Sequence, residues 1–345
     1  MKKYAGKMLG VPAYIRSSDS SPVITSPAAD SYAESLTPTI TWSGFGSADE
    51  IEIGVVLTGS PTETGITSGS YTADALPLSD DPYQVRVRKQ GGAWSAIVEF
   101  YVDIRSISST AIDFDARVGV FIDYTGVVPA TQNGDPIAVW KSRHNESIFA
   151  RIPTNTDSLR PSLEVDWLED LPCISPDGID DILEVAHATI GTTGWAPTVY
   201  ALGEFQENTS TRWDPISNGV SSMVMFQKGD DYFAKTFNWK VVASLNGADL
   251  IGTANGNFVA RAEPIWVRLH ISGNSAYYTI FPIANAGIQY ESTSGCNATG
   301  RGTDNVRLAD GVKISRLIIF PSALSAGNKS AVETYLNALS GIAFS

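Results

Sequence analysis

The end of the chain constrains the fold most, because a strand pattern there runs directly into a capped helix pattern. Residues 312–320 form an apolar run of strand length, and Pro321-Ser322 ends it with a turn. Ser325 can then cap a helix by accepting a free backbone N–H of its first turn, and Gly341 can end that helix. Apolar residues at i, i+3, i+4 and i+7 give the helix one apolar stripe: Val332, Tyr335, Leu336 and Leu339. A β-rich chain closed by one short helix is typical of a binding or structural module.

The composition favours an all-β protein with two domains. A length of 345 residues exceeds one typical domain, and 43% hydrophobic residues suffice for packed cores. Thirty glycines and 18 prolines separate short apolar runs, as in sheets joined by turns. We therefore expect an N-terminal arm (1–22), a small sandwich (23–103), a linker (104–112) and a larger sandwich with a C-terminal helix (113–345).

The net charge of −13 restricts the partners. A nucleic-acid backbone or an anionic membrane would need an excess of Lys and Arg, so we expect neither as a partner. The arm differs from the rest, because it carries four cations and one anion: Lys2, Lys3, Lys7 and Arg16 against Asp19. Two interpretations stay open, an anchor that docks on an acidic partner and a solvated tail.

The sequence predicts neither a membrane span nor a secretion signal. No apolar run reaches 18 residues. Two N-terminal lysines resemble the start of a signal peptide, but Lys7 and Pro12 interrupt the apolar segment that should follow. Cys173 and Cys296 lie far apart, and two small buried side chains are favoured over a disulfide. We therefore expect the chain to fold in a reducing cytoplasm.

Short strands separated by turns fill the region from 23 to 103, and β alternation is clearest after Tyr83. The informative pieces are Thr37–Trp42, Tyr83–Arg88, Trp94-Ser95 and Phe100–Val102. Together they resemble a fibronectin type III or similar immunoglobulin-like domain. The resemblance implies that Trp42 is part of the core and that Tyr83 fastens a corner, with Leu76 or Leu78 as the leucine that precedes it. Such domains are mostly spacers and adhesive modules.

A second and more specific pattern covers residues 113–345. Its pieces are, in order, Gly134–Trp140, Arg160-Pro161, Leu171–Leu183, Leu308–Gly311, the 312–320 strand, Leu324-Ser325, Val332–Leu336 and Gly341-Ile342. This order and spacing resemble a concanavalin A-like jelly roll of the laminin-G or pentraxin type. The chain departs from that family at Pro176, where an aromatic residue is usual, which leaves the local strand pairing open.

Residues 164–169 read Glu-Val-Asp-Trp-Leu-Glu, the literal catalytic signature of glucanases that share the jelly-roll fold. Such an enzyme needs two carboxylates on one strand face, about 5 Å apart for a retaining mechanism, and a bulge to bring the third acid onto that face. In the laminin-G-like pattern, however, Glu164, Asp166 and Glu169 fall in a connecting loop. The residues that follow Glu169 also differ from the Gly or Gln of the glucanases. We expect no catalytic residues, and a glucanase is the less favoured alternative.

Two other groups are candidates for ligand binding. Asp177, Asp180 and Asp181 could supply the closely spaced oxygens that calcium takes, as in several laminin-G-like domains. A tight Asp-Gly turn with solvated flanks is the simpler interpretation. Trp195 and Trp213 lie in turn-rich surroundings, where exposed rings could stack on sugars. We expect no bound cofactor, and Ca²⁺ at the three aspartates is the one possibility that stays open.

Modules of these two kinds normally work outside cells, yet the chain shows no export signal and no disulfide framework. A bacteriophage virion protein can work outside cells without an export signal or disulfides, because it folds in the host cytoplasm and leaves by lysis. The resemblance adds support, since both module types are common on phage capsids and tail appendages. We therefore expect a virion surface protein, more in keeping with capsid decoration or a head fibre than with a tail fibre.

Its expected partners are other virion proteins, held through the arm, further copies of the chain in a homo-oligomer, and host or environmental glycans. A short tail or baseplate adhesin stays open. The alternative from another class is a secreted bacterial carbohydrate-binding adhesin, located outside the cell.

Overall fold

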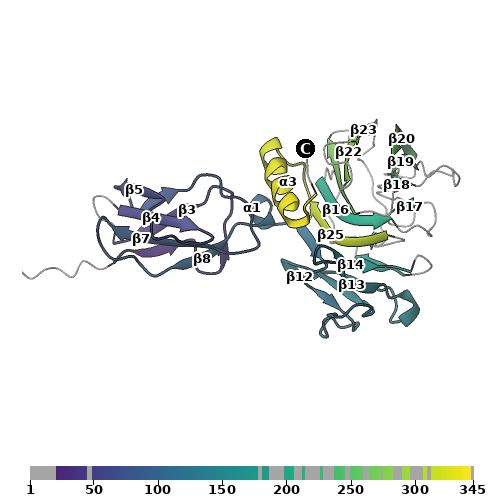
Figure 1. Cartoon of the computed structure of the whole chain (residues 1–345), viewed down its shortest axis with the longest axis horizontal. Helices are drawn as coiled ribbons and strands as arrows, with labels where there is room; N and C mark the ends of the chain where they lie inside the picture. Colours follow the sequence, from purple (N-terminus) through teal and green to yellow (C-terminus); the bar gives the residue numbers. More distant parts are fainter. Residues whose placement is uncertain are drawn as a thin grey trace, which may run out of the picture. The chain divides into compact units, whose positions relative to one another are not determined.

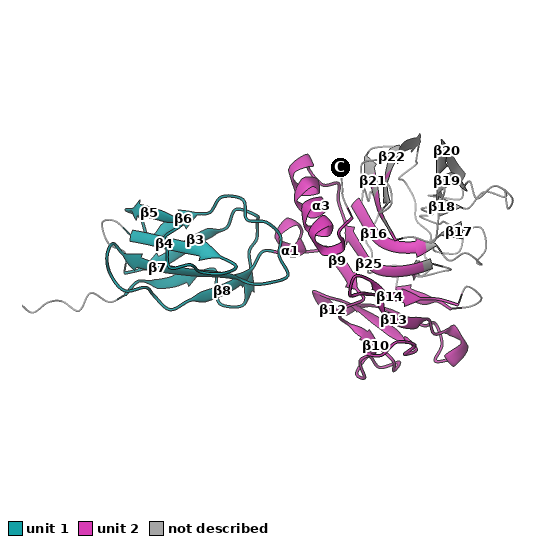
Figure 2. Ribbon diagram, viewed as in Figure 1, with its two compact units in different colours: residues 1–102 teal, residues 103–345 magenta. Residues whose placement is uncertain are grey.

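The computed structural model gives an all-β protein, which confirms the predicted fold class (Figure 1). The chain divides into two compact units, residues 1–102 and 103–345 (Figure 2). The described residues are 21–44, 49–177, 181–185, 198–205, 212–213, 226–227, 237–244, 249–258, 264–272, 275–282, 290–295, 306–308 and 312–342.

The described residues of unit 1 form two sheets. The smaller has the order β1 (Val23–Ser26), β3 (Thr39–Ser43), β6 (Ser70–Thr72). The larger has the order β2 (Ser31–Tyr32), β8 (Val98–Tyr101), β7 (Tyr83–Lys89), β4 (Asp49–Gly54), β5 (Glu63–Ile66). Strand β7 buries Tyr83, Val85 and Val87 and leaves the residues between them half-buried, as its alternating sequence predicts. Both sheets contribute fully buried apolar side chains, such as Ile40 and Ile51, so they share a core.

Two aromatic residues of unit 1 make the contacts that the fibronectin-like resemblance implies. The Tyr83 hydroxyl donates to the Pro77 carbonyl at 2.9 Å, which ties the start of β7 to the segment just before it. Trp42 is buried, and its indole N–H donates to the Asp49 carboxylate at 2.7 Å. Leu78 is the buried leucine before Tyr83, whereas Leu76 is half-buried.

An ion-pair ladder covers part of the larger sheet in unit 1. Glu50 pairs with Arg88, and Glu52 pairs with Arg86 at 2.6 Å, both between β4 and β7. The two guanidinium groups also lie over the Trp94 ring, at 4.6 Å for Arg86 and 4.2 Å for Arg88. These charges are therefore matched within the sheet.

Unit 2 contains two larger sheets. One has the order β10 (Val120–Phe121), β11 (Val139–Ser142), β12 (Asn145–Arg151), β15 (Leu183–Val185), β24 (Val306–Leu308). The other has the order β13 (Ser162–Leu168), β14 (Leu171–Ser175), β25 (Val312–Phe320), β16 (Thr198–Phe205), β21 (Ile265–Ser272), β22 (Ser275–Pro282), β23 (Tyr290–Gly295), and β9 (Ile112–Asp115) also pairs with β25. This sandwich-like arrangement is compatible with a jelly roll.

The described residues of unit 2 also form a smaller sheet and two short helical turns. A third sheet joins β17 (Arg212–Trp213), β18 (Phe226–Gln227), β19 (Phe237–Ser244) and β20 (Asp249–Phe258). The helical turns are α1 (Ile104–Ile107) and the 3₁₀ helix Asp157–Leu159. Strand β14 ends at Ser175, so the departure from the family pattern at Pro176 falls just beyond the strand.

The C-terminal helix α3 (Ala326–Ser340) begins and ends where the sequence predicts. The Ser325 hydroxyl accepts the Asn328 N–H at 3.2 Å, and Gly341 adopts the left-handed conformation with φ of 69°. The stripe residues Val332 and Leu336 are fully buried. Figure 1 shows α3 beside β16 and β25, and hydrogen bonds join it to the sheet, including the Trp266 indole N–H to the Ser340 hydroxyl at 2.7 Å.

The predicted linker at 104–112 is wrong, because this segment is a folded part of unit 2. Asp103 caps α1 in a capping box with Ser106. Ile104 and Ala111 are buried, and Ile112 is the first residue of β9. The run of Ser and Thr that suggested a linker belongs to a cap and a turn, where such residues also suit the backbone.

A buried ion network joins α1, β9, β25 and α3. Arg316 donates to both carboxylate oxygens of Asp113, at 3.0 and 2.7 Å, and neither side chain is exposed by more than 2%. Arg316 also donates to the Tyr335 hydroxyl at 2.8 Å. His144 Nε2 lies 3.3 Å from Asp113 and 3.8 Å from Asp103. Burial alone would raise the pKa of Asp113, but Arg316 and His144 outweigh it and hold that pKa far below its ordinary value.

His270 of β21 should make stability fall in mild acid. Burial, with smaller contributions from Lys329 and Arg268, lowers its pKa from 6.5 to about 4. Because the folded pKa lies below the unfolded one, the unfolded state takes up the proton first, and stability present above pH 6.5 is lost as the pH falls toward 4. Urea unfolding at pH 7.0, 5.5 and 4.5 should show this loss in the wild type and a shallower loss in His270→Gln. Equal slopes for the two proteins would contradict the assignment.

Candidate functional site

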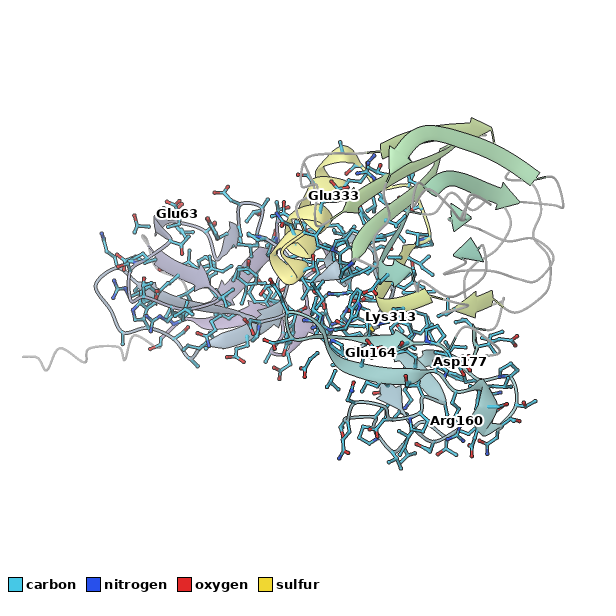
Figure 3. The ribbon with its side chains drawn as sticks, turned by 45° about the vertical axis from the view of Figure 1, so that its right-hand side comes forward. Glu63, Arg160, Glu164, Asp177, Lys313 and Glu333 are labelled. Carbon is cyan, nitrogen blue, oxygen red and sulfur yellow. The ribbon has the colours of Figure 1, made fainter. Side chains whose placement is uncertain are left out.

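Four neighbouring strands of the large sheet in unit 2 bring together a group that we call the Lys313 cluster. Its members are Glu164 and Trp167 of β13, Cys173 of β14, Lys313 of β25 and Glu204 of β16. The strand pairing places Glu164 opposite Cys173 and Glu204 opposite Lys313. Figure 3 shows Glu164 and Lys313 side by side. Residues far apart in the sequence thus form one row across the sheet.

The cluster is a connected polar network. The Lys313 ammonium lies 2.9 Å from a Glu164 oxygen and 4.0 Å from a Glu204 oxygen. The second Glu204 oxygen accepts the Trp167 indole N–H at 2.5 Å. The Cys173 thiol lies 3.8 Å from the Glu164 carboxylate. The side chains of Glu164, Lys313 and Glu204 are 33%, 19% and 14% exposed, so a ligand in solution can reach them.

Charge in the cluster is distributed so that Lys313 stays protonated and Cys173 stays a thiol. Burial lowers the pKa of Lys313, but its contact with Glu164 and the charge of Glu204 outweigh this and raise it. Burial, and then the charge of Glu164, raise the pKa of the Cys173 thiol far above its ordinary value. A nucleophilic cysteine requires the thiolate, so Cys173 is a buried, free and unreactive side chain.

The chemistry of the cluster suits the binding of hydroxyl groups. Two carboxylates offer acceptors and an ammonium offers donors, on strands that fix their positions, while the Trp167 indole N–H is already used by Glu204. Glycoside hydrolysis would also need one carboxyl group that donates a proton. Within the cluster, Lys313 contacts both Glu164 and Glu204, an arrangement that favours ion pairing over proton transfer.

The structure separates the three acids of the glucanase-like hexapeptide. Glu164 belongs to the Lys313 cluster, Asp166 is exposed, and Glu169 lies in the two-residue turn between β13 and β14. Glu169 and Asp170 both have positive φ, 41° and 70°, as a tight hairpin turn requires. The register shifts between Glu164 and Leu168, which marks a bulge in β13. The predicted connecting loop at 164–169 is therefore wrong: the segment is a strand and a hairpin turn.

The proposed calcium ligands are placed in part. The Asp177 backbone N–H donates to an Asp181 carboxylate oxygen at 2.6 Å. Asp181 is nearly buried and Asp177 is exposed. Within the described ranges, no group of three or more His, Cys, Asp or Glu side chains could hold a metal ion. The Asp181 carboxylate thus accepts a hydrogen bond from the backbone of a residue four positions earlier in the chain.

Several predicted site residues lie outside the described part of the chain: Lys2, Lys3, Lys7, Arg16, Asp180 and Trp195. For Trp213 only the backbone is described, in β17. Glu204 and Lys313, by contrast, were not foreseen as site residues. Their only sequence signal is a charged residue inside an apolar strand, and such a residue becomes informative once the strands are paired.

Neither known family models nor curated proteins match this chain. No helix among the described residues is long and apolar enough to cross a membrane. What the fold and the cluster define is a protein of two β-sandwich-like units with a partly exposed polar row on one sheet.

Proposed function

We propose that the chain is a structural protein of a bacteriophage particle surface, in which unit 1 is a fibronectin-like spacer and unit 2 a concanavalin A-like display module. The proposal rests on the observation that each unit is held together by contacts within itself. Tyr83 fastens a corner of unit 1, and the Asp113–Arg316 pair ties the last strand of unit 2 into its core. Such self-contained units suit exposure on a particle.

Charge supports an anchoring role for the arm. Residues 1–22 carry a net charge of +3 in a chain of −13, so an acidic neighbour in the particle would attract the arm. Capsid decoration or a head fibre is the favoured location, and a tail or baseplate position is the variant. A secreted adhesin is the alternative from another class.

Mass spectrometry of purified particles from the source tests the virion proposal. We expect the protein to co-purify with particles through a density gradient, and a chain lacking residues 1–22 to stay behind in the soluble fraction. Absence from washed particles would overturn the proposal. Recovery from the medium of particle-free cultures would favour the secreted adhesin.

Glycan binding at the Lys313 cluster is a second candidate function, favoured by its donors, acceptors and indole on one sheet. A glycan array with the full chain, with calcium and again with chelator, tests it. If the array shows binding, Glu204→Gln should weaken it at least tenfold, about 1.4 kcal/mol. Glu34→Gln, an exposed change in unit 1, should leave it unchanged.

Three results on the array would be informative. Loss of binding under chelator would point to the Asp177, Asp180 and Asp181 ion site. A silent array would leave a purely structural display role. Cleavage of polysaccharide that is lost in Glu164→Gln would instead identify a glucanase, and we expect no cleavage.

A further inference from the structure

In the part of unit 2 that the structure describes, the exposed large apolar side chains lie in one region. Among its described residues, the large apolar side chains with high exposure are Val118, Val127, Val128 and Phe149, at 45%, 72%, 47% and 37%. All four lie on, or in the loops that flank, the short strands β10, β11 and β12. We call this region the β10–β12 face. Concentration of exposed apolar surface in one place marks an interaction site more often than scattered exposure does.

Three aromatic rings and two cations link these residues into one surface. Phe149 lies opposite Lys141 in the β11–β12 pair, and the Lys141 ammonium lies 4.6 Å from the Phe121 ring centre. The Arg151 guanidinium covers both Tyr124, at 4.9 Å, and Phe149, at 5.5 Å. Aromatic residues and arginine are the types enriched where proteins bind each other.

The two most prominent valines are held in place by their own loop. The Asp123 carboxylate accepts the backbone N–H groups of Thr125, Val127 and Val128, at 3.0, 2.9 and 2.5 Å. Hydrogen bonds from the Thr125 hydroxyl and from these N–H groups hold the pKa of Asp123 far below its ordinary value. The loop therefore presents Val127 and Val128 in a fixed conformation, which lowers the entropic cost of binding through them.

The charged residues near the β10–β12 face indicate what kind of partner can bind there. Lys141 and Arg151 stand against Asp123 and Glu146, and Lys141 already pairs with Glu146 at 3.2 Å. The face is thus close to neutral, whereas the chain carries −13. Two copies of an acidic chain repel each other over most of their surface, and they can meet where each offers both signs of charge.

We infer that the β10–β12 face is the contact through which two copies of this chain associate. The contact is isologous: the same patch on each copy packs its valines and Phe149 against the other, and Arg151 of each can reach Glu146 of its mate. The inference does not depend on the virion or glycan proposals, because it concerns association of the purified chain alone.

Sedimentation equilibrium of the full chain tests this inference. We expect the wild type to reach about twice its mass of 36.9 kDa at tens of micromolar. The pair Val127→Asp and Val128→Asp should weaken association at least tenfold, since it places four like charges in the contact. Val56→Asp is the matched control, because Val56 is 77% exposed in unit 1, and it should leave association unchanged.

A second variant distinguishes weaker association from a loss of folding. Arg151→Gln changes an exposed side chain without setting a carboxylate opposite Glu184 of β15, and it should also weaken association, while the melting temperature stays near that of the wild type. A monomeric wild type at about 100 µM, a concentration far above the Kd of a specific dimer, would overturn the inference. Association that survives the Val127/Val128 pair, or that Val56→Asp weakens as strongly, would overturn it as well.

Discussion

Replacing Arg316 by methionine should cost unit 2 about 3–5 kcal/mol of unfolding free energy. The change leaves Asp113 fully buried without the guanidinium that contacts both of its oxygens, and it removes the donor to the Tyr335 hydroxyl on α3. Urea denaturation of the full chain at pH 7, followed by tryptophan fluorescence, measures the loss.

The double variant Asp113→Asn with Arg316→Met provides the control. Removing both charges eliminates the uncompensated carboxylate, so the double variant should be more stable than Arg316→Met alone. If it is no more stable, the loss in Arg316→Met does not come from an uncompensated Asp113 carboxylate.

Acid should weaken the wild type further once Asp113 protonates. Its folded pKa is depressed, so the stability it contributes is present above the unfolded pKa of about 3.9 and is lost as the pH falls below that value. Loss of stability in this range, beyond the His270 range, should be smaller in the double variant, which keeps other carboxylates of lowered pKa such as Asp123 and Glu52.

Gly119→Ala should destabilise unit 2 by about 2–5 kcal/mol, the second large effect. Gly119 has φ of 76°, a conformation that costs other residues about 1–2 kcal/mol. An added Cβ would also lie 2.7 Å from the Lys141 carbonyl oxygen, a backbone atom that cannot move freely, and such overpacking costs about 1–3 kcal/mol more. The Lys141 N–H donates to the Gly119 carbonyl at 2.7 Å, so β11 is fixed against this turn.

Gly134→Ala separates the two causes. Gly134 also has positive φ, 85°, but an added Cβ would meet nothing within 4 Å. This variant should therefore lose only the conformational part, about 1–2 kcal/mol. Equal melting temperatures for the two variants would show that the close approach to Lys141 has no effect.

Elements whose signals are local could be predicted from the sequence. Three of these predictions are confirmed: the 312–320 strand, the helix cap at Ser325 and the helix end at Gly341. They could be made because capping and periodicity act between residues a few positions apart. Trp42 is buried and the Tyr83 hydroxyl bonds to the Pro77 carbonyl, as the resemblance implies for a core residue and a corner residue. The capped turn α1 in residues 104–112 could not be predicted, since the same Ser and Thr residues suit a linker or a cap.

Of the Lys313 cluster, the sequence analysis singles out Glu164, for a different chemistry, and Cys173, as a buried side chain. Residues 162–167 do alternate between polar and apolar side chains, but the laminin-G-like pattern, which expects a connecting loop there, outweighed this local strand signal. Glu204 and Lys313 looked like ordinary charges within apolar runs. Their meeting depends on β25 pairing with both β14 and β16.

The all-β class, the capped C-terminal helix and the alternating strands follow from the sequence alone, because hydrophobic periodicity and caps are properties of neighbouring residues. The partners of the charged side chains become known only from the folded chain: Glu164 contacts Lys313, Asp113 contacts Arg316, and Arg151 lies over the rings of Phe149 and Tyr124. Strand register sets those contacts, and a shift of one residue would send each side chain to the opposite face of its sheet.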